Sequence, residues 1–106
     1  MLDTIKLLEE LRKHHQYEII SQTTRSVTSI GANFYESMVA RTKKEFIGIL
    51  GISLREAKES KYWLQLVSDL KVLSPEKLKF LSKELNEIIS ILTAGIKTSR
   101  RNLGNI

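Results

Sequence analysis

The sequence contains no cysteine, a single proline and only five glycines among its 106 residues. The absence of cysteine excludes disulfides, thiol nucleophiles and cysteine-based zinc sites, and it suits a reducing cytoplasm. Sheets and their turns usually need more glycine and proline than this, so the scarcity of both favours long helices. No apolar run approaches the ~20 residues that a bilayer-spanning helix needs, and the N-terminus, with Asp3, has no signal-peptide pattern. We therefore expect a cytoplasmic protein that makes no contact with a membrane.

The chain does have the composition of a packed domain. Apolar residues make up 42% and charged residues 27%, which is too apolar for a disordered basic tail. The length suits one domain, and we expect residues 1–106 to form a single core. The net charge of +5 is uneven, because residues 1–40 hold four Lys or Arg against five Asp or Glu and carry −1. Residues 41–106 therefore carry +6.

Apolar spacing predicts three long helices and one short one. The last long helix spans about 75–101, where apolar residues recur every three or four positions after a start marked by Ser74 and Pro75. Another begins at Thr42, the first residue of a capping box, and continues to about residue 70. A third spans about 16–40, and a short helix over about 3–13 precedes it. The fold class predicted is all-α, an antiparallel up-down four-helix bundle with connections near 14–16, 40–42 and 71–74. No Gly or Pro marks the first break, so one continuous helix remains an alternative.

Within the helix over 16–40, one stripe of residues alternates at three- and four-residue steps and predicts the core-facing seam. It consists of Tyr17, Ile20, Thr24, Val27, Gly31, Phe34 and Met38. Thr24 and Gly31 have little bulk, so we expect a neighbouring helix to approach closely there and to present Gly48 and Gly51.

Catalysis finds no support in the sequence. There is no glycine-rich phosphate loop, no Ser-His-acid spacing and no pair of Glu-x-x-His motifs. His14 and His15 are adjacent, so on a helix they diverge by about 100° and would not chelate one metal. We expect no enzyme activity, no catalytic residues, no cofactor and no metal.

Three stretches carry a family resemblance. They are Arg25–Ser37 (RSVTSIGANFYES), Thr42–Ile47 (TKKEFI) and Leu54–Leu66 (LREAKESKYWLQL). Together they resemble the bacterial four-helix-bundle family named for reading frames in intervening sequences of 23S ribosomal RNA genes, although Arg55 replaces the family's usual Lys and Ser60 its usual Thr. Members usually carry a further stretch before the position of Ile5. The resemblance thus implies a shortened first helix, which leaves part of the core uncovered or covered by a partner chain.

The resemblance also implies an assembly and a set of polar positions. It implies a homopentamer similar to the accessory protein of diversity-generating retroelements, a basic barrel associated with nucleic acid and a reverse transcriptase, and it does not imply an enzyme. The polar residues that match the family motif are Arg25, Ser29, Asn33, Glu36, Glu56 and Glu59. We favour a structural or interface role for them over direct recognition of a ligand.

Two functions follow as hypotheses. The first is a non-enzymatic oligomeric scaffold that associates with RNA or DNA through counterion release. Its candidate phosphate contacts are Arg41, Lys43, Lys44, Lys97, Arg100 and Arg101. Solvated charge and helix-dipole matching explain the same residues without a ligand. The alternative is a protein-interaction bundle whose partner is a polypeptide such as a reverse transcriptase, with no nucleic-acid contact of its own.

Overall fold

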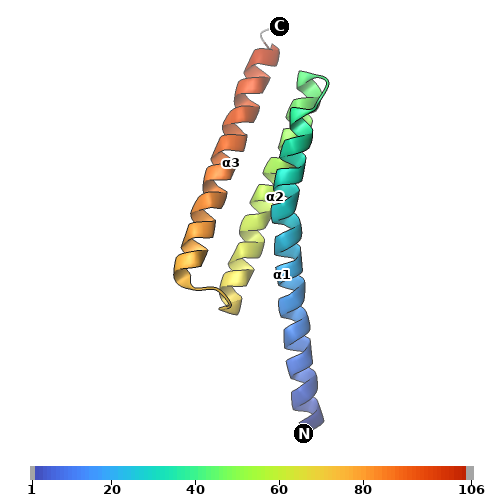
Figure 1. The fold of residues 1–106 in the computed structure, drawn as a ribbon, viewed down its shortest axis with the longest axis vertical. Coiled ribbons are helices and arrows are strands. Elements are labelled where there is room, and N and C mark those ends of the chain that lie inside the picture. Colours follow the sequence, from blue (N-terminus) through green and yellow to red (C-terminus); the bar gives the residue numbers. More distant parts are fainter. Residues whose placement is uncertain (1, 105–106) are drawn as a thin grey trace.

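The computed structural model describes residues 2–104 and shows three α-helices that run up, down and up (Figure 1). They are α1 (Leu2–Met38), α2 (Lys43–Leu70) and α3 (Pro75–Gly104), and the part of the chain described contains no strand. The all-α prediction is confirmed. The expected fourth helix is not observed, since three helices account for the described residues.

The difference lies in α1, which is continuous over 37 residues. His14 and His15 stand inside the helix and not in a turn. No Gly or Pro interrupts the chain before Gly31, and once a helix has nucleated each added residue gains a hydrogen bond at small propensity cost. Residues 3–15 are all exposed, and this part of α1 extends beyond the turn between α2 and α3 (Figure 1).

The other two connections fall where the sequence predicts them. The Glu45 backbone N–H donates to Thr42 Oγ1 at 3.0 Å, which caps the start of α2. Lys71 ends α2 in the left-handed conformation, with φ of 58°. The Lys77 N–H donates to Ser74 Oγ at 3.2 Å, so Ser74 caps α3. The two side-chain caps satisfy N–H groups that have no partner within the helix, Thr42 at the start of α2 and Ser74 at the start of α3.

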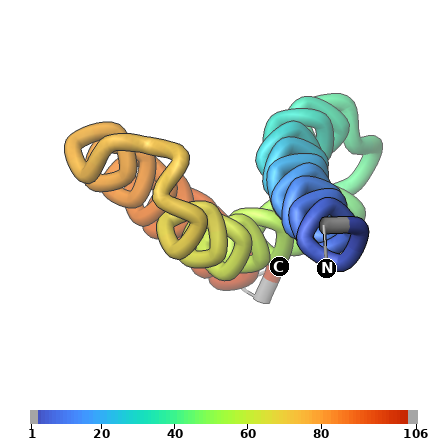
Figure 2. Tube along the Cα trace, turned by 90° about the horizontal axis from the view of Figure 1, so that it is seen from below, coloured from blue at the N-terminus to red at the C-terminus, as the bar shows by residue number. Residues whose placement is uncertain are grey.

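The helices form an open V and not a closed bundle. Figure 2, which looks along the long axis, shows α1 and α3 on two sides of α2, and the backbones of α1 and α3 do not approach each other. The radius of gyration is 18.3 Å, against about 13 Å for a compact domain of this length. None of the described helices is long and apolar enough to cross a bilayer.

Apolar side chains join α2 to α3. The buried cluster comprises Leu50 and Ala57 of α2, Leu85, Leu92 and Ile96 of α3, and Ile30 of α1. On α3 this is the seam that the spacing of its leucines predicts. The side chains of Phe46, Leu54, Ile88 and Ile89 pack around it.

Serines, not glycines, line the contact between α1 and α2. Ser26, Ser37, Ser53 and Ser60 are each at most 1% exposed. The Ser53 hydroxyl donates across the interface to the Ile30 carbonyl at 2.8 Å, and the Ser60 hydroxyl donates to Ser26 Oγ at 2.9 Å. Small side chains permit the close approach, and their hydroxyls find partners inside it, as buried polar groups must.

The glycines that the sequence places at a close helix contact are not packed against another helix. A Cβ built on Gly31, Gly48 or Gly51 would meet nothing within 4 Å. The predicted seam on α1 is also wrong for a single chain, because the face turned to α2 contains Ile19, Ser26 and Ile30. All seven residues of the predicted seam, Tyr17 to Met38, are instead exposed.

Candidate nucleic-acid interface

The six candidate phosphate contacts lie at one end of the molecule. Arg41, Lys43 and Lys44 belong to the turn between α1 and α2 and to the first turn of α2, whereas the other three belong to the last turns of α3. Figure 1 shows that turn and the C-terminal end of α3 at the same end of the molecule. All six side chains are exposed. Folding therefore gathers two clusters that are more than fifty residues apart in the chain.

Local structure fixes both clusters. In the turn, the Ala40 N–H donates to the Ser37 carbonyl at 3.2 Å, and the Thr42 cap starts α2 immediately afterwards. On α3, Lys97, Arg100 and Arg101 are three and four residues apart, which places them on one face of the helix. A short turn followed by a capped helix start, and the end of a 30-residue helix, thus position the cations.

Helix dipoles account for only part of this set. Arg101 lies in the last turn of α3, where the negative end of the helix dipole stabilises a cation without any ligand, and the effect falls off toward Lys97. Lys43 and Lys44 occupy the first turn of α2, where the dipole is positive and disfavours them. Their charge adds to the positive end of α2, which makes this end of the molecule attractive to anions.

Charge counting shows how far the excess is concentrated. Contacts between Ser53 and Ile30 and between Leu50 and Gly95 align residues 31–54 with residues 91–103 as one end of the structure. That end holds six Lys or Arg against Glu36 and Glu45, a net charge of +4. The remaining 11 cations and 10 anions of the chain leave only +1. We call residues 31–54 and 91–103 the basic end.

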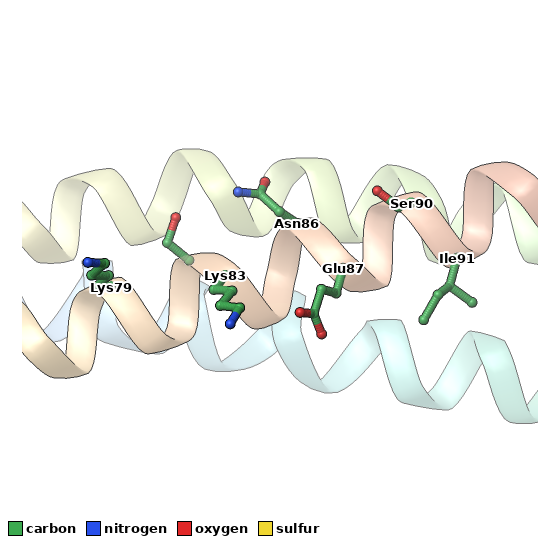
Figure 3. A pocket seen from close by; sticks show the side chains of 7 residues that line it. Lys79, Lys83, Asn86, Glu87, Ser90 and Ile91 are labelled. Atoms are coloured by element: carbon green, nitrogen blue, oxygen red, sulfur yellow. The ribbon is translucent and has the colours of Figure 1, made fainter.

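The side of α3 outside the basic end has mixed charge. A shallow hollow runs along this helix and is lined by α3 residues alone, among them Lys79, Lys83 and Glu87 (Figure 3). Because a single helix supplies the lining, its polar groups do not converge on one point. The hollow therefore lacks the convergent groups of a binding site. Its lysines lie on the same helix as the basic residues of α3 but outside the basic end, so substituting them is a control for substituting cations of the basic end.

Three of the six family-motif polar residues come together between α1 and α2. The Arg25 guanidinium forms ion pairs with Glu59 and Glu56, the latter at 3.3 Å, and its Nε donates to Gln22 Oε1 at 2.9 Å. The hydrogen bond to Glu59 raises the pKa of Arg25 above its ordinary value. The cluster lies at the edge of the serine-lined contact, where it fixes how α1 lies on α2.

The other three motif residues stay apart from this cluster. Asn33 Nδ2 donates to the Ser29 carbonyl within α1 at 2.8 Å, and Glu36 is exposed. Among the described residues there is also no group of three or more His, Asp or Glu side chains arranged to hold a metal ion.

The buried serines of the contact between α1 and α2 are the feature that sequence reasoning missed. Ser53, Ala57 and Ser60 continue the three- and four-residue spacing of Leu50 and Leu64 on α2. That spacing was the available signal, since a small polar residue in register with apolar ones indicates a close helix contact.

Comparison with known proteins gives a family and a fold. The family model described as 23S rRNA-intervening sequence protein matches residues 1–94. A crystal structure from Bacteroides thetaiotaomicron VPI-5482, described as a protein with unknown function from the S23 ribosomal protein family, is 37% identical. Its TM-score is 0.72, and the match covers 74% of this chain and 73% of that chain. No protein with a curated function matches this sequence. The chain belongs to the 23S rRNA-intervening sequence protein family.

Proposed function

We propose that this family member is a non-catalytic, oligomeric scaffold that holds RNA or DNA at its basic end. The observation that carries the proposal is the concentration of charge, since the basic end has a net charge of +4 and the rest of the chain has +1. Lysine and arginine side chains bind phosphates by releasing condensed counterions, without reading the base sequence. Several copies of such an end would multiply the local field.

Two triple variants of α3 test where the nucleic acid binds. Replacing Lys97, Arg100 and Arg101 by Gln removes three charges from the basic end. Replacing Lys77, Lys79 and Lys83 by Gln removes three equally exposed charges from the same helix outside it. Both variants have a formal net charge of +2, and glutamine preserves helix propensity. A comparison between them therefore separates the location of charge from its total.

Binding is measured as retention of a labelled RNA and a labelled DNA of mixed sequence while the salt concentration is raised from about 50 mM. For duplex DNA, each phosphate contact contributes about −0.9 to the slope of log K against log salt. Loss of three contacts should therefore flatten the slope by up to about 2.7 in the basic-end variant and leave it nearly unchanged in the control. Equal losses in both variants would contradict the assigned location. If the unmodified protein retained neither RNA nor DNA at about 50 mM salt, the proposal would be overturned and a polypeptide partner would be favoured.

A further inference from the structure

The basic end has an apolar part as well as a cationic one. Four large apolar residues at the end of α1 and the start of the following turn are exposed, namely Phe34, Tyr35, Met38 and Val39. The cations of the turn begin two residues later, at Arg41. Singly exposed apolar side chains are common on protein surfaces, but here four lie within six residues and directly beside a cationic cluster.

Tyr35 is the most exposed residue of this apolar part, at 71%, and it faces away from α2. It lies five residues after Ile30 and two before Ser37, which are buried against α2. At about 100° per residue, its side chain is directed roughly 140–160° away from that face. Glu36, the one acid in this part of α1, lies about 100° around the helix from Tyr35. The Tyr35 ring is therefore open to a ligand that approaches from solvent.

An exposed aromatic ring beside cations distinguishes single-stranded from duplex nucleic acid. Phosphates are present in both forms, so cations alone would bind either. In a duplex the faces of the bases are stacked against each other, whereas an unpaired strand exposes them to aromatic side chains. Proteins that bind single strands without sequence preference combine a cationic track with rings on which bases stack. The apolar part of the basic end therefore favours the single strand.

We propose that the basic end binds single-stranded RNA or DNA, with one base stacked on Tyr35 and the neighbouring phosphates bound by the cations of the turn between α1 and α2. This inference rests on the proposed function and names the form of nucleic acid that the basic end takes. Tyr35 lies about 5 Å along the helix axis from Met38, where α1 ends. One strand can therefore reach the ring and the cations of the turn together.

Two tyrosines on the same face of α1 provide matched variants. Tyr17 and Tyr35 are 18 residues apart, which is five helical turns, and they are 68% and 71% exposed. Only Tyr35 belongs to the basic end, because Tyr17 lies about 27 Å further along the helix. Tyr35→Ala and Tyr17→Ala thus remove the same ring from the same helix face and leave the net charge at +5. Tyr35→Phe retains the ring and removes the hydroxyl.

Affinity is measured for unstructured single strands of RNA and DNA and for the duplex of the same DNA sequence, at several salt concentrations. The unmodified protein should bind the single strands more tightly than the duplex. Tyr35→Ala should weaken single-strand binding at least about fivefold and leave duplex binding unchanged. The slope of log K against log salt should stay the same, because a stacked ring releases no counterions. Tyr17→Ala and Tyr35→Phe should bind like the unmodified protein.

The contrary results separate this inference from the proposed function. Equal losses in Tyr35→Ala and Tyr17→Ala, or in Tyr35→Ala and Tyr35→Phe, would overturn stacking on Tyr35. Equal affinity of the unmodified protein for duplex and single strand would overturn the preference while leaving the proposed function standing. A changed assembly mass of Tyr35→Ala in light scattering would assign the ring to a contact between protein copies and contradict the inference. Only an unmodified protein that binds neither form would overturn the proposed function as well.

Discussion

Replacement of Gly48 by alanine tests whether the helices approach each other at glycines or at serines. Sequence spacing alone places a close helix contact at Gly48, in which case a methyl group there would clash. In the structure, Gly48 is exposed and a Cβ built on it meets nothing within 4 Å. The structure therefore predicts that Gly48→Ala is stabilising.

The expected magnitude comes from helix propensity alone, because the new methyl group neither contacts nor displaces another atom. Alanine is favoured over glycine in a helix interior by about 0.8–1.0 kcal/mol. For a chain of this size that corresponds to a rise in Tm of roughly 4–8 °C. Both values refer to the free energy of unfolding, and part of the gain arises in the unfolded state, where alanine has less freedom than glycine.

Urea denaturation followed by tryptophan fluorescence and circular dichroism measures this change. The single tryptophan, Trp63, lies on α2, half-buried and with its ring 5.1 Å from that of Tyr62, so its emission reports the packing of α2. Each curve is recorded at several protein concentrations, because self-association would make the midpoint depend on concentration. A destabilised Gly48→Ala would refute the reasoning, since it would mean that another helix lies against Gly48.

Two further substitutions probe the contact between α1 and α2. Ala57→Leu adds bulk at a fully buried position between Ser53 and Ser60. We expect it to lower the free energy of unfolding, measured with urea, by about 1–3 kcal/mol. An unchanged urea midpoint would contradict close packing at this position. Arg25→Gln removes the pairs with Glu56 and Glu59 and should lower the urea midpoint less than Ala57→Leu does, by an amount that shrinks as salt is added. The pair with Glu59 raises the pKa of Arg25, and arginine stays charged throughout the accessible pH range. Salt is the variable that tests the pairs, because it screens them without protonating the carboxylates.

The helices themselves were predictable because their ends are local. Thr42 and Ser74 cap the helices that follow them, and Lys71 ends α2, at the places that short-range hydrogen bonding dictates. The predicted break near His14 was wrong because no local signal ends the helix there. Residues of moderate helix propensity do not end a helix that no cap, Gly or Pro interrupts. Local chemistry thus determined all three helices, including the one whose length was misjudged.

Which face of α1 meets α2 could not be predicted from apolar spacing. Two stripes run along this helix, a bulky one through Val27 and Phe34 and a small one through Ser26 and Ser37. A rule that buries the bulkier stripe would turn Val27 and Phe34 toward α2, which is wrong for a single chain. The small stripe faces α2 instead, because α2 presents Ser53, a small side chain that fits a small opposing face. The choice depends on a partner more than twenty residues away in the sequence.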